Sequence, residues 1–195
     1  MKQLVLASNN AKKMAELQVL LAPLGIEVIP QGALGVPEAE EPHCTFVENA
    51  LTKARHAAQW TGLPALADDS GLCVDALGGA PGVYSARYAG EPKSDARNNA
   101  KLLADLAPHQ DRRARFCCVL ALVRRADDPQ PIIAEGEWSG EIVASPRGAS
   151  GFGYDPLFYI PAWGKTVAEL DAATKNAQSH RGQAMARLCQ RLQGR

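Results

Sequence analysis

Two adjacent carboxylates, Asp68 and Asp69, follow an apolar run and precede Ser70 and Gly71. Because successive side chains of a strand point to opposite faces, one carboxylate should face a site and the other a structural partner. We assign Asp69 to the site. Carboxylate oxygens are ligands that Mg²⁺ prefers, and protein-bound Mg²⁺ often serves phosphate chemistry. We expect the pair at an acidic turn where the strand ends; the alternative is an Asx-turn without a catalytic role.

A polar segment near the N-terminus could bind an anion. It reads Ser8-Asn9-Asn10-Ala11-Lys12-Lys13 and lies between an expected strand and an expected helix. Backbone N–H groups at a helix N-terminus attract anions, and the two lysines could reach phosphate oxygens. The alternative is a capped helix with two solvated lysines. Lys53, in an alanine-rich stretch, could also reach a phosphate, although a single helical lysine more often faces solvent.

An acidic loop offers a second metal ligand. Glu40 and Glu41 lie in a segment without helical or strand periodicity. Either glutamate could fold over the site, but acidic loops are more often simply solvated. The residues alone therefore leave the choice between the two open.

A late glycine-rich loop, Gly151-Phe152-Gly153-Tyr154-Asp155-Pro156, carries two aromatic residues and one carboxylate. Aromatic side chains in such a loop can stack on a purine ring, and Asp155 could accept a hydrogen bond from a ring N–H. The alternative is a bulge that packs Phe152 into the core.

Basic residues gather where the last helix should begin. Lys175 and the run Ser179-His180-Arg181 suit an anion or a carbonyl oxygen. His180 could act as a general base, but no acidic pair lies near it in sequence, so we favour a role in recognition.

The composition favours one α/β domain of ordinary size. The chain has 195 residues, 46% of them hydrophobic, with 21 basic and 21 acidic residues. The zero net charge argues against a nucleic-acid binder, and the chain lacks the roughly 18 consecutive apolar residues of a membrane span. Five cysteines form no C-x-x-C pair, and the adjacent Cys117 and Cys118 suggest buried free thiols in a reducing cytoplasm.

The expected elements alternate between strands and helices, and this pattern indicates a mixed sheet flanked by helices. The stretches from Arg115 to Arg124 and from Pro131 to Val143 should form a hairpin. Thr45 and Glu48 form a capping-box pattern that should open a helix reaching about Trp60. Further strands are expected at residues 3–7, 26–29, 64–68, 72–76 and 156–160, and further helices after residues 10, 94, 166 and 179.

These segments together resemble the XTP/dITP diphosphatases, also called the inosine triphosphate pyrophosphatase family. The resemblance runs the full length of the chain, and six segments in this order make it specific. They are Leu6–Lys13, Thr45–Ala50 with Lys53, Ala67–Leu72, Gly78–Tyr88, Gly151–Pro156 and Ser179–Gln183.

The resemblance implies a Mg²⁺-dependent enzyme that hydrolyses ITP, dITP and XTP to the monophosphate and pyrophosphate. It implies a single pyrophosphatase domain over residues 1–195, with two lobes and a cleft between them, and a homodimer. Asp69 would bind metal and help to activate water, and Glu41 would be the second metal ligand. The implied substrate contacts are Ser8, Asn9, Asn10, Ala11, Lys12, Lys13, Lys53, Ser70, Phe152, Gly153, Tyr154, Asp155, Lys175, His180 and Arg181.

Two other functions are compatible with the same residues. One is a Mg²⁺-dependent phosphatase that releases single phosphates, although Asp68-Asp69-Ser70 lacks the Asp-x-Asp pattern of aspartyl-phosphate enzymes. The other is a nucleotide sensor, which would keep the lysines and the aromatic loop but would need no metal carboxylate. Whether Asp69 acts as a base or only as a metal ligand stays open at this point.

Overall fold

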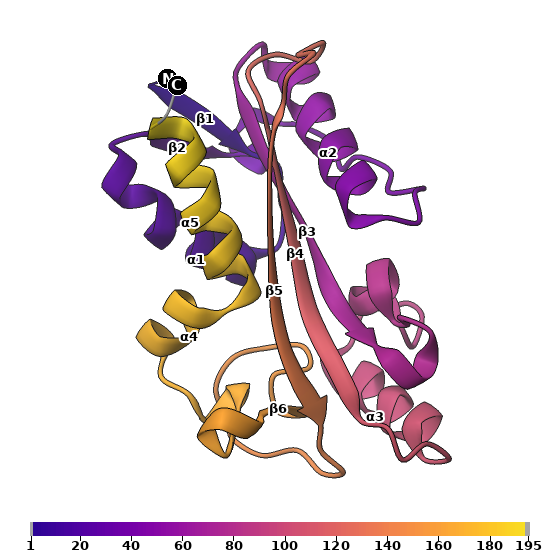
Figure 1. The fold of residues 1–195 in the computed structure, drawn as a ribbon. Helices are drawn as coiled ribbons and strands as arrows, with labels where there is room; N and C mark the ends of the chain where they lie inside the picture. The colour runs from indigo at the N-terminus through magenta and orange to yellow at the C-terminus, as the bar shows by residue number, and fades with distance from the viewer. Residues whose placement is uncertain (1, 194–195) are drawn as a thin grey trace. The chain divides into compact units, whose positions relative to one another are not determined.

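The structure is a computed structural model that describes residues 2–193. Within this range the strands form one seven-stranded sheet in the order β2-β1-β3-β4-β5-β6-β7 (Figure 1). The strands are β1 Gln3–Leu6, β2 Glu27–Pro30, β3 Ala65–Val74, β4 Arg113–Val123, β5 Ile132–Ile142, β6 Phe158–Ile160 and β7 Lys165–Thr166. The α-helices are α1 Ala11–Leu21, α2 Phe46–Thr61, α3 Asp95–Leu106, α4 Ala172–Gln178 and α5 His180–Gln193.

The sheet is mixed, as the sequence predicted. β1 pairs in parallel with β2 and with β3, whereas β6 pairs antiparallel with β5 and β7. β4 and β5 are neighbours in the sheet and are joined by a short turn, which agrees with the expected hairpin. No helix in the described range is long and apolar enough to cross a membrane.

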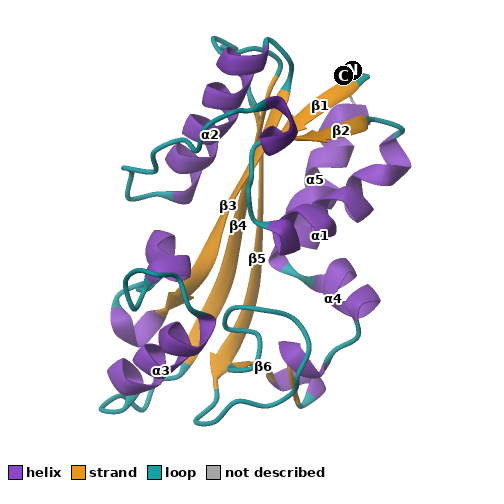
Figure 2. Cartoon of the chain, turned by 180° about the vertical axis from the view of Figure 1, so that it is seen from behind, coloured by secondary structure: helices purple, strands orange, loops and turns teal. Residues whose placement is uncertain are grey.

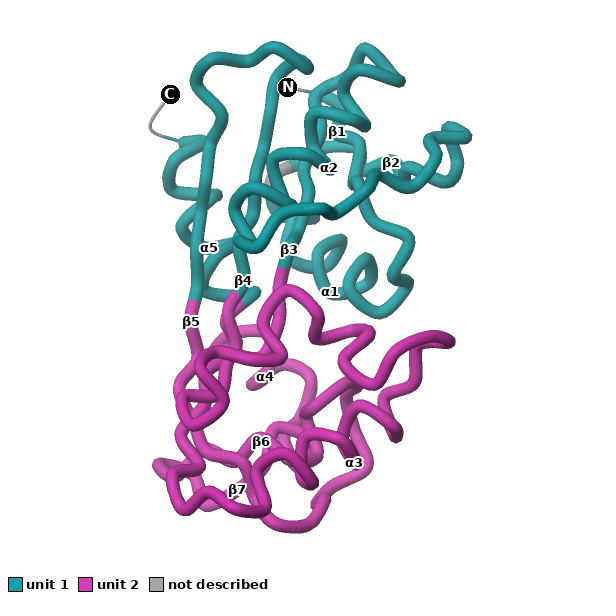
Figure 3. Tube along the Cα trace, turned by 90° about the vertical axis from the view of Figure 1, so that its right-hand side faces the viewer, with its two compact units in different colours: residues 1–69, 118–136, 181–195 teal, residues 70–117, 137–180 magenta. Residues whose placement is uncertain are grey.

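The chain divides into two compact units (Figure 3). Unit 1 contains residues up to Asp69, Cys118–Gly136 and the segment from Arg181 onward; unit 2 contains Ser70–Cys117 and Glu137–His180. The chain therefore passes from one unit to the other inside β3, β4 and β5 and again at the start of α5, between His180 and Arg181. The expectation of a single domain with two lobes stays a prediction.

Strand alternation builds two separate cores in unit 1. Leu4 and Leu6 of β1 pack in one cluster with residues of α1 and α5, while Val5 and Ala7 pack in another with the alanines of α2. Figure 2 shows α1 and α5 on one side of these strands and α2 on the other. Because the buried face of α2 is made of small alanines, the helix backbone can approach the sheet closely.

Unit 2 has its own core, built around a fully buried phenylalanine. Phe158 of β6 lies 4.4 Å from the Phe116 ring, centroid to centroid, and 6.3 Å from that of Trp138. Leu102 and Leu106 of α3 are fully buried in the same cluster. Their spacing of four residues places them on one helix face, as the sequence indicated.

Three of the local helix signals are confirmed, whereas the segment after Thr166 forms only a three-residue 3₁₀ helix, Val167–Glu169. Asn10 caps α1, Thr45 caps α2 by accepting from the backbone of Glu48, and Ser94 caps α3. Gly25 ends the first helical segment with φ +64°, a conformation that side chains other than glycine rarely adopt. These signals act between near neighbours, so the sequence alone carries them.

Two expectations about the strands are wrong. The acidic turn at Asp68 and Asp69 does not exist, because β3 runs without a break from Ala65 to Val74. Its neighbours in the sheet satisfy the backbone, and charged side chains of other segments satisfy the carboxylates, so the polar pair needs no turn. The strand expected at residues 156–160 begins at Phe158 and is followed by β7, whose two residues are too few for a detectable pattern.

Gly140 tests the packing of β5 against β6. A Cβ at this position would lie 2.4 Å from the carbonyl oxygen of Tyr159 and 2.6 Å from the Phe158 ring. We predict that Gly140→Ala lowers the free energy of unfolding by about 1–3 kcal/mol, because the backbone must shift. Urea denaturation measures the effect, with Ser139→Ala at the exposed neighbouring position as the matched control. If Gly140→Ala and Ser139→Ala had the same free energy of unfolding, the close contact of Gly140 with Tyr159 and Phe158 would be contradicted.

Candidate functional site

A lysine and two carboxylates meet in unit 1, and we call them the Lys53 cluster. Lys53 Nζ of α2 lies 2.8 Å from Asp69 Oδ1 of β3 and 3.2 Å from Glu41 Oε1. The preceding loop places Glu41 there, while its neighbour Glu40 is exposed. The structure therefore brings together three residues that the sequence analysis proposed for phosphate and metal.

The second oxygen of Asp69 is the unusual feature of this cluster. Asp69 is 5% exposed, and its Oδ2 is buried without a hydrogen-bond partner. Leaving a buried charged oxygen unpaired costs free energy, which a ligand with positive charge would recover. Burial raises the pKa of Asp69, and the charge of Lys53 only partly offsets the rise. Asp69 thus attracts a proton or a cation more strongly than an ordinary aspartate does.

Lys53 stays charged in this setting. Burial alone would lower the pKa of Lys53, but the charges of Asp69 and Glu41 outweigh that effect and raise it. With both carboxylates ionised, the Lys53 cluster carries two negative charges against one positive charge. An excess negative charge remains for a cation to neutralise.

Asp68 faces a different set of partners. Its Oδ1 accepts from Lys13 Nζ at 2.7 Å, and its Oδ2 accepts from Arg181 Nε at 3.0 Å and from the Cys118 thiol at 3.1 Å. Burial would raise the pKa of Asp68, but the charges of Arg181 and Lys13 hold it well below its usual value. The predicted separation of the two carboxylates is confirmed, although it occurs inside a strand.

Arg181 is a buried member of this second cluster. It is 3% exposed and also forms an ion pair with Glu16 of α1. Asp68, Glu16, Lys13 and Arg181 together carry two charges of each sign, so this group balances within itself. Neither Glu16 nor Cys118 was anticipated, although Glu16 lies one helical turn after Lys13 and could have been noticed for that reason.

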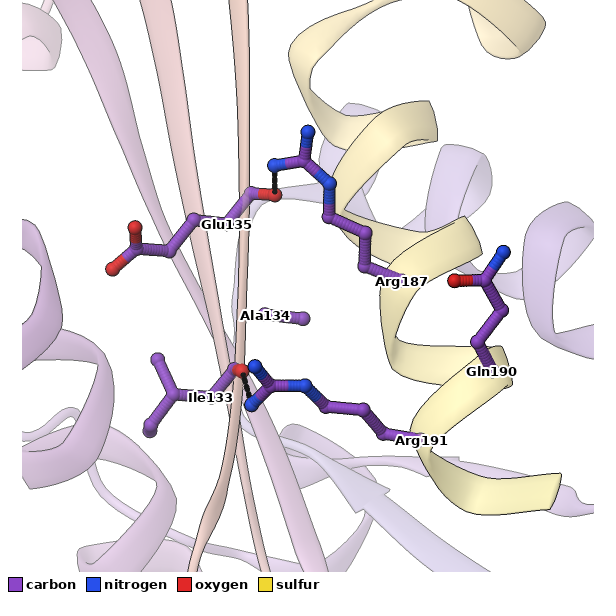
Figure 4. Close-up of a pocket in the computed structure, with 6 residues that line it drawn as sticks. All are labelled: Ile133, Ala134, Glu135, Arg187, Gln190 and Arg191. Atoms are coloured by element: carbon purple, nitrogen blue, oxygen red, sulfur yellow. Dashed lines mark hydrogen bonds between the residues drawn. The ribbon is translucent and has the colours of Figure 1, made fainter. Parts of the chain in front are cut away.

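Two further arginines hold α5 against the sheet (Figure 4). Arg187 donates to the carbonyl oxygen of Glu135 at 2.6 Å, and Arg191 to that of Ile133 at 2.5 Å. A cavity of about 530 Å³ lies between these residues and Gln190. Because α5 begins next to Arg181, these contacts fix the helix whose first turn supplies the partner of Asp68.

The N-terminus of α1 is capped by its own polar residues. Asn10 Oδ1 accepts from the backbone of Lys12 and of Lys13, both at 3.1 Å, and Ser8 Oγ accepts from the Asn10 backbone at 3.2 Å. Asn9 Oδ1 accepts from Gln31 at 3.0 Å. Ala11 is the first helical residue and is exposed. Lys13 is not a solvated lysine, since its ammonium group binds Asp68.

Asp155 organises the glycine-rich loop of unit 2. Its Oδ2 accepts from the Phe152 backbone and from Lys175 Nζ, both at 2.9 Å. Lys175 Nζ also lies 4.5 Å from the centre of the Phe152 ring. Gly151, with φ +80°, approaches Asp155 so closely that a Cβ would lie 2.1 Å from Oδ2. The loop thus presents an aromatic ring, a carboxylate and a buried lysine together.

The two aromatic residues of this loop differ in burial. Tyr154 is 4% exposed and belongs to the core of unit 2, with its hydroxyl donating to the Ser85 carbonyl at 2.8 Å. Phe152 is only half-buried, so the core role considered for Phe152 belongs to Tyr154. Gly153 is held on both sides, by Asp95 at 2.8 Å and Asn99 at 3.0 Å, two residues that sequence reasoning missed.

His180 lies in unit 2 at the start of α5. It is 7% exposed and stacks on Phe116 with a centroid distance of 4.9 Å and an interplanar angle of 14°. Ser70, the first residue of unit 2, is half-buried in β3. The predicted residues therefore fall into two groups, with Ser8 to Lys13, Glu41, Lys53, Asp69 and Arg181 in unit 1 and the rest in unit 2.

The Lys53 cluster fits a hard divalent cation. No group of three or more metal-binding side chains occurs among residues 2–193. Mg²⁺ does not need one, because it commonly binds one or two carboxylates and completes its shell with water and phosphate oxygens. Asp69, with its unpartnered buried oxygen, and Glu41 are the residues that would hold it.

Carboxylates beside a lysine, and an aromatic ring beside a carboxylate and a lysine, are groups that an enzyme acting on nucleotides can use. The family model described as the Ham1 family matches residues 4–191. The chain belongs to the Ham1 family.

Similar proteins cover the chain almost completely. A dITP/XTP pyrophosphatase of Aromatoleum aromaticum is 70% identical over 97% of this chain and 96% of its own length. One of Ralstonia nicotianae is 68% identical over 98% and 97%. The solved structure of a HAM1 protein from Coxiella burnetii is 54% identical, covers 100% of both chains and has a TM-score of 0.95.

Asp68 should contribute stability that depends on pH. We predict that Asp68→Asn costs about 3–5 kcal/mol at neutral pH, because it leaves buried cations without their carboxylate. Since the folded pKa of Asp68 is lowered, this stability is complete above the unfolded pKa of about 3.9 and is lost as the pH falls through the folded pKa. The difference between variant and wild type should therefore shrink below about pH 4.

Urea denaturation across the acid range measures this difference. Asp127→Asn is the matched control, because Asp127 pairs with Arg125 while its side chain is 84% exposed. The control should change stability by less than about 1 kcal/mol. A cost for Asp68→Asn that is the same at pH 3 and pH 7 would show that the charge of Asp68 is not its source.

Proposed function

We propose that this protein hydrolyses non-standard purine nucleoside triphosphates, dITP, ITP and XTP, to the monophosphate and pyrophosphate. Such a reaction removes deaminated purines from the nucleotide pool. The observation that carries the proposal is the unpartnered buried oxygen of Asp69 inside a cluster with excess negative charge. The relatives named dITP/XTP pyrophosphatases, which match over almost their full length, support the substrate class.

The residues of unit 1 would hold the triphosphate. Lys53 and Lys13 supply the positive charge, and the polar segment Ser8–Lys13 supplies backbone and side-chain donors at the start of α1. Lys53 forms ion pairs with Asp69 and Glu41. A metal cation that binds these two carboxylates would take the place of the lysine ammonium group. The lysine would then turn its ammonium group toward phosphate oxygens.

Asp69 and Glu41 would bind the metal, which we propose is Mg²⁺. When bound, Mg²⁺ neutralises phosphate charge and lowers the pKa of a coordinated water. Asp69 would also lie beside the attacking water and would be placed to accept its proton. Attack at the α-phosphorus, with pyrophosphate as the leaving group, gives the proposed products. The lysines would hold the phosphate chain in line for this attack.

The residues of unit 2 would recognise the base. The half-buried ring of Phe152 offers a stacking surface, and Lys175 and Asp155 beside it offer a donor and an acceptor. Inosine and xanthine carry a carbonyl at position 6, where adenine carries an amine. A donor such as Lys175 or His180 would form a hydrogen bond to this carbonyl. When adenine binds, the same donor would be left without an acceptor, and adenine would therefore bind more weakly. Gly153, Tyr154, Ser70 and Arg181 complete the proposed contacts.

We further propose that the protein works in the cytoplasm as a homodimer, with no nucleic acid or membrane as partner. Its balanced charge supports the absence of a nucleic-acid partner. Its five free cysteines suit a reducing compartment.

The first test is the hydrolysis of dITP, ITP, XTP, GTP and ATP with and without Mg²⁺, with the products identified. We expect monophosphate and pyrophosphate from the first three, in the presence of Mg²⁺, and little reaction of GTP or ATP. Release of orthophosphate would instead identify a phosphatase. Nucleotide binding without turnover would identify a sensor.

The two loop glutamates provide a matched pair for the metal site. We predict that Glu41→Gln raises the Mg²⁺ concentration needed for half-maximal rate by about tenfold, or about 1.4 kcal/mol, whereas Glu40→Gln leaves it unchanged. Asp69→Asn should lower the rate by about 10²- to 10⁴-fold while nucleotide binding remains. Equal effects of Glu41→Gln and Glu40→Gln would remove Glu41 from the proposed metal site.

A further inference from the structure

Two cysteines of unit 2 lie side by side on neighbouring strands. Cys73 belongs to β3 and Cys117 to β4, and these strands are adjacent in the sheet. The Cys117 thiol donates to Cys73 Sγ with a distance of 4.0 Å between the sulfur atoms. Both thiols are free and half-buried, so a small oxidant can reach them. A disulfide needs a separation of about 2 Å, so the two sulfur atoms must approach each other by about 2 Å.

We propose that Cys73 and Cys117 form a peroxide-responsive thiol pair, which a hydroperoxide converts into an intramolecular disulfide between β3 and β4.

The surroundings assign different roles to the two thiols. The hydrogen bond from Cys117 lowers the pKa of Cys73 and outweighs the opposing effect of burial, while the charge of Arg115 acts on both thiols. The same hydrogen bond raises the pKa of Cys117. Since the thiolate is the reacting form, Cys73 is the thiol that meets the oxidant, and Cys117 is the thiol that resolves the product.

The chemistry balances in two steps. The Cys73 thiolate attacks one oxygen of the hydroperoxide, so that an S–O bond forms, the O–O bond breaks and the leaving alkoxide takes up a proton. Cys117 then loses its proton and attacks the sulfenic sulfur of Cys73, so that the S–S bond forms and the hydroxyl group leaves as water. Two thiols are oxidised by two electrons, and the hydroperoxide is reduced to an alcohol and water.

The second step is favoured by the first. Cys117 holds its proton because it donates to a thiolate, and conversion of Cys73 to the sulfenic acid removes that negative charge. The resolving sulfur already lies beside its target, so the reaction is intramolecular. Fast capture of the sulfenic acid would also protect Cys73 from irreversible oxidation.

Another cysteine shows why this pair is distinctive. Cys118, the next residue after Cys117, is 1% exposed and donates to Asp68, and burial raises the pKa of its thiol. Such a thiol is unreactive. Adjacent residues of β4 therefore differ in reactivity because alternation points them to opposite faces of the strand.

The test uses the full chain and hydrogen peroxide. After oxidation and removal of the peroxide, the thiols are counted under denaturing conditions, and the digested protein is analysed by mass spectrometry without reduction. We expect the count to fall from five to three, since two thiols are consumed, with a peptide linking Cys73 to Cys117. Dithiothreitol should restore all five. Retention of five thiols, or a disulfide that involves Cys44 or Cys189, would overturn the proposal.

Variants distinguish the two roles. In Cys117→Ser, the sulfenic acid at Cys73 should persist long enough to be trapped by dimedone; in Cys73→Ser, no thiol should be lost. Cys44→Ser is the matched control, because it removes an exposed cysteine and should form the same disulfide as wild type. Dimedone labelling of Cys44 instead of Cys73 would contradict the assignment. These readouts do not depend on nucleotide hydrolysis, so failure of one proposal leaves the other intact.

Discussion

The ion pairs of Asp68 are the interaction on which the site in unit 1 depends. Asp68 is 2% exposed, and a buried carboxylate is tolerated only with charged partners around it. Those partners come from separate parts of the chain, Lys13 in α1 and Arg181 in α5. Their contacts tie both helices to the middle of β3. The segment that carries Lys13 is therefore fixed by ion pairs to Asp68, a carboxylate that the proposed chemistry does not use.

Side-chain alternation along β3 places the next carboxylate, Asp69, in a different environment from Asp68. Because Asp68 points to the face of α1 and α5, Asp69 must point to the opposite face, where α2 supplies Lys53. The two groups have different charge balances. Asp68 and Glu16 balance the charges of Lys13 and Arg181, while the Lys53 cluster keeps an excess negative charge and an unpartnered oxygen of Asp69. On the same strand, Asp68 is fully paired with cations, while Asp69 keeps an oxygen that can bind a further cation.

The sequence predicts the local features well and the distant contacts poorly. The caps at Asn10, Thr45 and Ser94 depend on residues two or three positions apart, and all three are confirmed. Cys118 comes from another strand, and no local pattern marks it, while Glu16 lies one turn after Lys13 but pairs with the distant Arg181. The expected acidic turn failed for the same reason, since the groups that stabilise carboxylates inside β3 lie far away in the chain.

Lys53 lies where its charge offsets the repulsion between Asp69 and Glu41. Two carboxylates close together repel, and one of them would move away or take up a proton. The ammonium group of Lys53 lies within 3.2 Å of both and reduces that repulsion. A lysine is suited to this role because its flexible side chain can leave the carboxylates when a stronger cation arrives. The charge of Lys53 would then be available to the phosphate that accompanies the metal.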